Sequence, residues 1–187
     1  MLVGAMSRVS PEKGVLNLVH GFSHALETCP NLRLAIIGGC QEEHAQHLES
    51  IQTLVRELNL SRKIALLGYR ENAFEILKAM DVYITTSLSE GLPYNVLEAI
   101  ALERPVIVTD IPGNNDIIRD SIEGILIPPN SIEGTAHGIL KMFSMKEAHR
   151  DSLIRNASER LEKDFSLEKM TSSVFSLYKK ALNSHFR

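Results

Sequence analysis

The sequence of 187 residues predicts an α/β fold, a doubly wound parallel sheet covered by helices on both faces. Three observations predict it. Short, continuously apolar segments alternate with segments whose apolar residues recur at helical spacing. The apolar segments end at glycines, prolines or polar turns, and neither a linker nor an internal repeat divides the chain. Strands that are apolar throughout must be buried on both faces, and the helices of right-handed crossovers bury them in this way.

The individual elements follow from these patterns. The predicted strands are residues 2–6, 32–37, 64–67, 81–86, 105–109 and 125–127. The predicted helices are residues 13–28, 42–58, 72–80 and 95–103. Residues 132–186 are expected to be helical with a break at residues 164–166, where Ser166 is suited to be the N-cap of the last helix. We therefore expect one Rossmann-like domain over residues 1–187 with extra helices at its carboxyl end.

Composition and charge exclude several classes of function. The net charge of −3 gives no basic face for nucleic acid. Two cysteines, Cys29 and Cys40, are too few for a disulfide framework and are expected to be reduced thiols. No apolar run approaches the roughly 18 residues of a membrane span, and no signal peptide follows Met1. A cytoplasmic protein is expected.

The loop after the first predicted strand carries two cations, Arg8 and Lys13. They bracket the start of the first helix, where free backbone N–H groups and the helix dipole favour an anion. A guanidinium beside an ammonium suits a diphosphate. Two solvated surface cations are the alternative interpretation of the same residues.

Two glutamates, Glu90 and Glu98, follow the fourth predicted strand. Glu90 lies on the loop at the carboxyl end of that strand, and Glu98 lies in the helix that comes next. Ligands bind beyond the carboxyl ends of the strands in an open parallel sheet. This arrangement suits a ligand with a phosphate and vicinal hydroxyls, although a lone glutamate is more often a surface charge.

Three further loops are expected at the same edge, so that five strand ends form one binding crevice. They carry Gly38-Gly39-Cys40, Gly68-Tyr69-Arg70 and the polar turn at residues 109–116. The absence of a G-x-G-x-x-G motif and of a P-loop disfavours a nicotinamide dehydrogenase and an ATPase. No Asp-x-Asp pair marks a metal–diphosphate site. The pairs His20/His24 and His44/His47 have metal-ligand spacing but no third ligand nearby in sequence, so no metal is expected.

Taken together, these segments resemble the carboxyl-terminal, donor-binding domain of GT-B glycosyltransferases, in particular the retaining family four (glycosyl transferases group 1). The matching segments are Arg8-x4-Lys13-Gly14, the residues 34–39, 65–69 and 79–84, Glu90-Gly91-Leu92-Pro93 with Glu98-Ala99, and the residues 104–110 and 124–129. The sequence departs from the usual pattern at Ser7, at Glu103-Arg104 and at Asp116. The turn at residues 113–116 is similar to that of members in bacterial surface polysaccharide biosynthesis.

The resemblance implies a role for each matched residue. Arg8 and Lys13 would hold the donor diphosphate and stabilise the charge on the departing nucleotide, as catalytic residues together with Glu90. Glu90 would face the transferred sugar, with the amides of Gly91 and Leu92 near sugar and phosphate. Glu98 would accept hydrogen bonds from the ribose, and the backbone around Tyr69 and Arg70 would lie against the base.

The resemblance also implies an activity: transfer of a sugar from a UDP- or GDP-linked donor to a glycan or lipid-linked acceptor, with retained configuration and with neither metal nor cofactor. The acceptor-binding amino-terminal domain is absent, so this chain alone is expected to be inactive. The full-length enzyme could associate with the inner membrane face. A non-catalytic nucleotide-sugar-binding subunit and a GT-B nucleotide-sugar epimerase are the alternatives. The sugar, base and acceptor are not specified by these residues.

Overall fold

A computed structural model describes residues 1–185 and contains one six-stranded sheet in which every strand is parallel to its neighbours. The strand order is β3-β2-β1-β4-β5-β6. The strands are β1 (Leu2–Met6), β2 (Arg33–Ile37), β3 (Ile64–Gly68), β4 (Val82–Thr85), β5 (Val106–Thr109) and β6 (Ile125–Ile127). All six predicted strands are confirmed, and so is the doubly wound α/β fold.

The centre of the sheet is the pair β1 and β4, in register at Val3↔Val82 and Gly4↔Tyr83. Chain order runs outward from β1 through β2 to β3, and then from β4 through β5 to β6. The order reverses between β1 and β4, so the loops that leave these two strands diverge to opposite faces. A topological switch point therefore lies at the carboxyl ends of β1 and β4, where Arg8, Lys13 and Glu90 follow in sequence.

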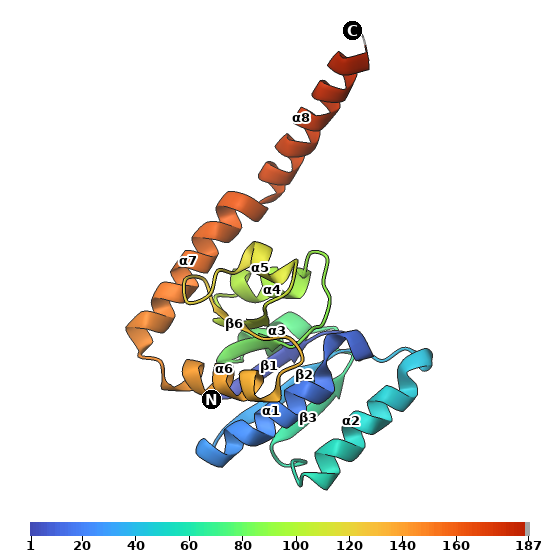
Figure 1. The fold of residues 1–187 in the computed structure, drawn as a ribbon, viewed down its shortest axis with the longest axis vertical. Coiled ribbons are helices and arrows are strands. Elements are labelled where there is room, and N and C mark those ends of the chain that lie inside the picture. Colours follow the sequence, from blue (N-terminus) through green and yellow to red (C-terminus); the bar gives the residue numbers. More distant parts are fainter. Residues whose placement is uncertain (186–187) are drawn as a thin grey trace.

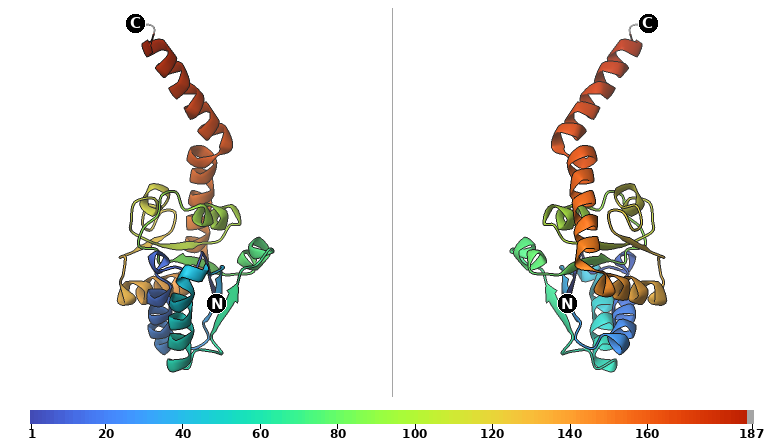
Figure 2. Two further views of the ribbon diagram at one scale, coloured as in Figure 1. Left: turned by 90° about the vertical axis from the view of Figure 1, so that its right-hand side faces the viewer. Right: turned by 90° about the vertical axis from the view of Figure 1, so that its left-hand side faces the viewer.

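Helices pack around the sheet (Figure 1), and two clusters of buried hydrophobic side chains lie between the sheet and these helices. One cluster includes buried residues of α1 (Val15–Thr28), α2 (Ala45–Glu57) and α6 (Ile132–Ser144). The other includes residues of α3 (Ala73–Lys78), α4 (Tyr94–Ala101), α5 (Asn114–Ile117) and α7 (Glu147–Phe165). Figure 2 shows the helices on both sides of the sheet, as the apolar strands require.

Several helix boundaries differ from the prediction. The first helix does not begin at Lys13, because a short 3₁₀ turn (η1, Pro11–Lys13) and Gly14 in a left-handed conformation precede α1. A similar turn, η2 (Glu42–His44), precedes α2. The carboxyl-terminal region breaks a second time at Met145-Lys146, between α6 and α7. The turn after β5 contains the short helix α5, which the sequence analysis treats as a loop.

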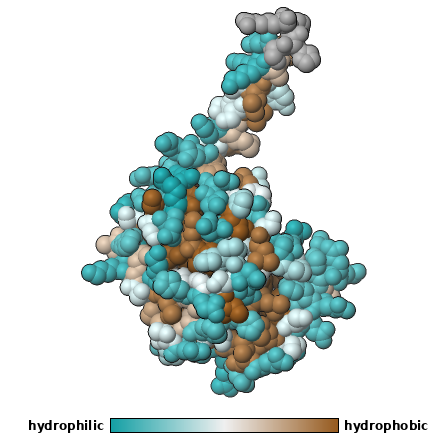
Figure 3. Space-filling view, in the orientation of Figure 1, coloured by the Kyte–Doolittle hydropathy of each residue, from teal (hydrophilic) through white to brown (hydrophobic). Residues whose placement is uncertain are grey.

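The last helix, α8 (Leu167–His185), continues from α7 and extends away from the body of the domain (Figures 1 and 2). The predicted break is confirmed: Ser166 lies between the two helices, and its hydroxyl accepts a hydrogen bond from the amide of Lys169 at 3.2 Å. Residue 186, which the prediction includes, lies outside the described residues. Large apolar side chains of α8 are exposed, among them Leu167, Met170 and Phe175. Figure 3 shows apolar surface along this helix. Within residues 1–185, no helix has the length and apolar character to cross a membrane.

Candidate functional site

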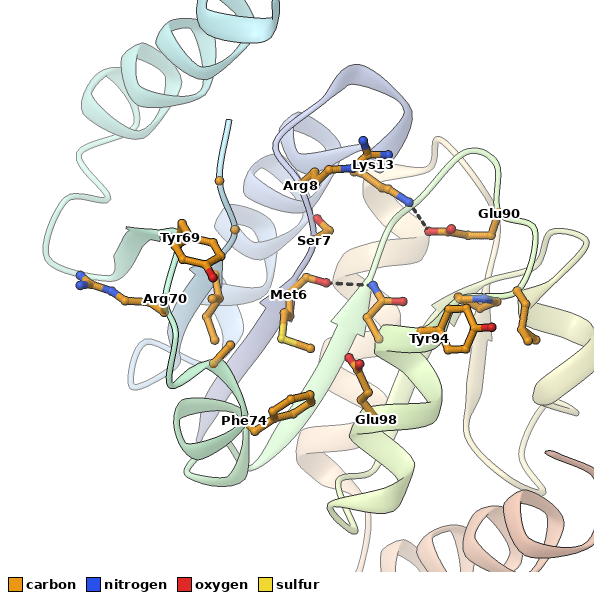
Figure 4. A pocket seen from close by; sticks show the side chains of 17 residues that line it. Met6, Ser7, Arg8, Lys13, Tyr69, Arg70, Phe74, Glu90, Tyr94 and Glu98 are labelled. Carbon is orange, nitrogen blue, oxygen red and sulfur yellow. Dashed lines mark hydrogen bonds and ion pairs between the residues drawn. The ribbon is translucent and has the colours of Figure 1, made fainter. Parts of the chain in front are cut away.

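A groove of about 460 Å³ lies at the carboxyl edge of the sheet (Figure 4). It is built from the ends of β1, β2 and β3 with the loops that follow them, from the loop after β4, and from the first turns of α3 and α4. Its lining side chains are Met6, Ser7, Arg8, Lys13, Ile37, Gly38, Gly39, Tyr69, Arg70, Ala73, Phe74, Glu90, Leu92, Pro93, Tyr94, Asn95 and Glu98. The groove therefore lies at the carboxyl ends of the strands, as predicted, and includes the switch point between β1 and β4.

Lys13 is positioned by a tight turn at Gly14. The backbone of Gly14 has a φ of 64° and packs against β4, so a Cβ at this position would lie 2.2 Å from the carbonyl oxygen of Thr86. The Thr86 hydroxyl donates a hydrogen bond of 3.0 Å to the carbonyl oxygen of Gly14. These contacts join the loop after β1 to the end of β4 and leave the Lys13 side chain mostly buried in the groove, with 14% exposed.

Two hydrogen bonds attach the start of the loop that carries Glu90. The amide of Leu88 donates to the carbonyl oxygen of Glu12 at 2.7 Å, and the hydroxyl of Thr109 on β5 donates to the carbonyl oxygen of Ser87 at 2.6 Å. The carboxylate of Glu90 accepts a hydrogen bond from the ammonium of Lys13 at 2.8 Å and is 10% exposed (Figure 4). Residues 77 positions apart in the sequence thus form one ion pair at the groove.

Glu98 lies on the face of α4 that lines the groove (Figure 4). Its side chain is half-buried, and burial raises the pKa of its carboxyl above the ordinary value. On the same helix, Asn95 donates to the carbonyl oxygen of Met6 at 2.8 Å, and the hydroxyl of Tyr83 donates to the same oxygen at 3.2 Å. Asn95 thus joins the end of β1 to α4, and Tyr83 joins it to β4, so the core sets the distance between the Arg8 loop and Glu98.

Exposed aromatic side chains form the outer walls of the groove. Tyr69 is 75% exposed, Phe74 52% and Tyr94 67%, and all three line it (Figure 4). The two arginines that line the groove, Arg8 and Arg70, are exposed as well. Aromatic rings and exposed guanidinium groups at the rim, together with the mostly buried Lys13 and Glu90, suit a ligand with both a ring and phosphate charge.

The structure brings most of the predicted site residues together. Arg8, Lys13, Tyr69, Arg70, Glu90, Leu92 and Glu98 all line the groove. Gly91 belongs to the same loop but is not among the lining residues. The expectation of five converging loops is wrong in one respect: residues 109–116 do not line the groove. Gly113, in this turn, instead packs against the backbone of the loop that carries Glu90, where a Cβ would lie 2.4 Å from the carbonyl oxygen of Gly91.

Sequence reasoning missed Met6, Phe74, Tyr94 and Asn95, which also line the groove. Each lies within five residues of a predicted site residue or strand end, which is the one signal that could have indicated them. The described residues 1–185 contain no group of three or more histidine, cysteine, aspartate or glutamate side chains that could hold a metal ion. The histidine pairs on the helices therefore gain no third ligand in this part of the chain.

Comparison with known proteins gives the family. The family model of glycosyl transferases group 1 matches residues 2–160. The chain is 33% identical over 138 residues to the putative glycosyltransferase EpsD of Bacillus subtilis, covering 74% of this chain and 35% of that protein. It is 32% identical over 122 residues to the UDP-Gal:alpha-D-GlcNAc-diphosphoundecaprenol alpha-1,3-galactosyltransferase of Escherichia coli, covering 65% of this chain and 31% of that one.

Solved structures share the fold. The crystal structure of Anabaena HepE in complex with UDP-glucose superposes with a TM-score of 0.88 at 19% identity, over 96% of this chain and 48% of that chain. The chain thus spans about half of that protein and about a third of the two curated relatives. A family model that matches most of the chain, and a sheet with the same architecture as GT-B enzymes, lead to one conclusion. The chain belongs to the glycosyl transferases group 1 and has the fold of the carboxyl-terminal domain of a GT-B glycosyltransferase.

Proposed function

We propose that this chain is the donor-binding part of an enzyme that transfers a sugar from a nucleoside-diphosphate sugar, with retained configuration and without a metal ion. One observation carries the proposal. Lys13, Glu90 and Glu98 come from three separate segments and line one groove at the switch point of the sheet. The ammonium of Lys13 matches the diphosphate, the carboxylate of Glu90 matches the sugar, and the carboxylate of Glu98 matches the ribose.

Each part of the donor has a proposed partner. Lys13 and the exposed Arg8 bind the diphosphate and stabilise the negative charge that develops on the departing nucleotide, which is the step that most needs electrostatic help. Two cations at this position do work that a metal ion can do elsewhere, and we therefore propose metal independence. Glu98 accepts hydrogen bonds from the ribose hydroxyls, and the wall formed by Tyr69, Arg70 and Phe74 lies beside the base.

The relatives support the class of substrates. The Escherichia coli relative is named for UDP-galactose and for a diphosphoundecaprenol-linked acceptor, and the Anabaena protein binds UDP-glucose. We extend to this chain a UDP- or GDP-linked donor and a glycan or lipid-linked acceptor. This chain spans only part of the relatives' length, and we assign the acceptor site to the part that it does not span, so the activity is proposed for the combination of both parts.

Calorimetric titration with UDP, GDP and ADP tests the donor site directly. Each nucleotide is titrated once with magnesium chloride and once with a chelator. We expect one of the three to bind in both conditions with the same affinity. Binding that requires magnesium would contradict the metal-independent site, and the failure of all three at millimolar concentration would contradict the proposed function.

The Glu98→Ala substitution tests the ribose contact. The variant is expected to weaken UDP by about 1.5 kcal/mol, since a charged hydrogen-bond acceptor is lost, and to leave inorganic pyrophosphate unchanged because pyrophosphate has no ribose. The measurement is titration of both ligands into both proteins. Equal losses for UDP and pyrophosphate would contradict the ribose contact.

A further inference from the structure

The ion pair between Lys13 and Glu90 is held in place by contacts within the protein. Its Nζ–Oε1 distance is 2.8 Å, and both side chains are mostly buried. The backbone fixes the two partners independently of this contact. The Leu88–Glu12 hydrogen bond and the close packing of Gly14 on Thr86 join their loops. The carboxylate therefore stays beside the ammonium in the rigid framework of the site.

This arrangement has a cost for an anion that approaches Lys13. The groove is lined by the cations Arg8, Lys13 and Arg70 and by the carboxylates Glu90 and Glu98. A phosphate that contacts Lys13 must share that ammonium with Glu90, and it therefore comes close to the negative charge of the Glu90 carboxylate. The mostly buried position of the pair reduces the screening of this repulsion by water.

The repulsion between Glu90 and the second phosphate of the ligand depends on whether that phosphate is free or linked to a sugar. The terminal phosphate of a free nucleoside diphosphate resembles a phosphomonoester, with a charge of about −1.5 to −2 at pH 7. The same phosphate linked to a sugar has lost its second ionisation and carries a single charge. The sugar also brings hydroxyl groups, which can donate hydrogen bonds to a carboxylate. Glu90 should thus repel the free diphosphate more than the sugar-linked one.

We propose that Glu90 is a specificity-determining residue, which favours the nucleoside-diphosphate sugar over the free nucleoside diphosphate by sharing Lys13 with the phosphate. The groove then holds the donor and releases the nucleotide left after transfer. This inference rests on the proposed function, and it assigns to the ion pair a role in discrimination between substrate and product.

The test compares the dissociation constants of UDP and UDP-glucose by calorimetry for the wild type, Glu90→Gln and Glu98→Gln. The substitution Glu90→Gln keeps the shape of the side chain and removes its charge. It is expected to bind UDP about tenfold more tightly than the wild type and to bind UDP-glucose no more tightly, because one unit charge near the terminal phosphate is removed. Glu98→Gln is the matched control: it removes the same charge from the same groove, and it should change both affinities by the same factor.

A second variant tests whether the effect passes through Lys13. In a Lys13→Ala background, the substitution Glu90→Gln should raise UDP affinity by a smaller factor than in the wild-type background, because the phosphate no longer competes with Glu90 for the ammonium and only the direct repulsion remains. Glu90→Gln with an unchanged ratio of UDP to UDP-glucose affinity would overturn the inference while leaving the proposed function intact. A wild-type protein that binds neither ligand would overturn both. Thermal unfolding of each variant checks that the compared proteins are folded.

Discussion

Glu90 and Glu123 lie at opposite ends of the parallel strands. Both are mostly buried and ion-paired, yet their positions and partners indicate different roles. Glu90 follows β4 at the carboxyl edge, whereas Glu123 precedes β6 at the amino edge. Glu90 has one cationic partner, Lys13, and lines the groove. Glu123 is 1% exposed and is surrounded by donors.

The surroundings of Glu123 bind several segments together. Arg119 donates to its carboxylate from the guanidinium and from the backbone amide, the latter at 2.9 Å. The guanidinium of Arg160, on α7, lies 3.6 Å from the same carboxylate and donates to the carbonyl oxygen of Asp116 at 2.9 Å. Burial alone would raise the pKa of Glu123, but the hydrogen bonds and charge of Arg119, with the charge of Arg160, lower it overall.

The comparison teaches that burial and pairing do not by themselves identify a binding site. Glu123 has its hydrogen-bonding capacity taken up by groups of the protein, so the cluster holds α7 to the loop between α5 and β6. The Glu90 carboxylate keeps capacity for a ligand, because its second oxygen has no hydrogen bond within the described residues 1–185. Position at the carboxyl edge and unused acceptors distinguish the candidate functional carboxylate from the structural one.

The largest expected effect is the loss of stability in Glu123→Ala. The substitution leaves Arg160 near the protein interior without its carboxylate, and removal of one partner of a buried pair costs about 3–5 kcal/mol. Urea unfolding of the purified chain measures this free energy. The matched control is Glu159→Ala on the exposed side of α7, which should change the free energy of unfolding by less than about 0.5 kcal/mol. Similar values for the two variants would remove the distinction drawn between the two carboxylates.

Lys13→Ala, in contrast, is expected to lower UDP affinity and to change the stability of the fold little. Loss of the ammonium should weaken UDP binding by about 1.5–3 kcal/mol, the contribution of hydrogen bonds to charged groups. The free energy of unfolding should fall by less than about 1 kcal/mol, since Glu90 lines the groove, where water can hydrate it once it is unpaired. Calorimetry and urea unfolding of the same preparation give both values. A large loss of stability without a loss of affinity would make this ion pair structural, like that of Glu123.

The sequence predicted the framework well and the contacts between its parts poorly. All six strands were predictable because each is an apolar run that ends at a turn residue. The position of Arg8, Lys13, Glu90 and Glu98 on one edge followed from the rule that parallel strands share a carboxyl edge. The pairing of Lys13 with Glu90 depends on how two distant loops pack, and no periodicity encodes it.

The burial of Glu123 is likewise not predictable from the sequence. It lies in Ser121-Ile122-Glu123-Gly124, a segment with the composition of an exposed turn, and only the structure reveals that α7 covers it. Asn156 of α7 contributes to that cover, donating to the carbonyl oxygen of Ile122 at 2.9 Å. The role of a polar residue in a turn is set by what a later helix places over it.

Acid should affect the two edges of the sheet differently. A lowered pKa in the folded state means that Glu123 stabilises the fold at pH values above the ordinary glutamate value near 4.5, and that this contribution is lost as the pH falls below it. The difference in unfolding free energy between the wild type and Glu123→Gln should therefore shrink from pH 7 to pH 3.5. A difference that is independent of pH would mean that ionisation of Glu123 does not contribute to the free energy of unfolding.

In the groove, burial raises the pKa of Glu98, so this carboxylate takes up its proton at a higher pH than an ordinary glutamate. If the ionised form binds the ribose, UDP affinity should start to fall at a pH above 4.5, before the Glu123 contribution is lost. Calorimetric titration of UDP from pH 7.5 to pH 5 measures this, and pyrophosphate corrects for protonation of the phosphates. A loss that is equal for UDP and pyrophosphate would exclude Glu98 as its cause.

The smallest expected effect tests whether the Arg160 cluster at one end of the strands influences the Glu90 loop at the other end. Asp116 connects them: its carbonyl oxygen accepts from Arg160, and its carboxylate accepts from the amide of Gly113 at 3.2 Å. Gly113, with a φ of 89°, rests against the carbonyl oxygens of Glu90 and Gly91, where a Cβ would lie within 3.0 Å of both. Asp116→Ala should cost about 1 kcal/mol of stability, as the loss of a helix cap does, and should weaken UDP binding about two- to threefold by loosening the Glu90 loop.

The neighbouring substitution Asn115→Ala separates this effect from general disturbance of the turn. The Asn115 side chain is exposed and donates to Asp110 at 3.1 Å, away from Gly113. It should lower stability by a similar or smaller amount and leave UDP affinity unchanged. If both variants weaken UDP equally, the turn acts as a whole and Asp116 has no special role. If only Asp116→Ala does, the contacts that run from α7 through Asp116 and Gly113 contribute to the position of the carboxylate at the groove.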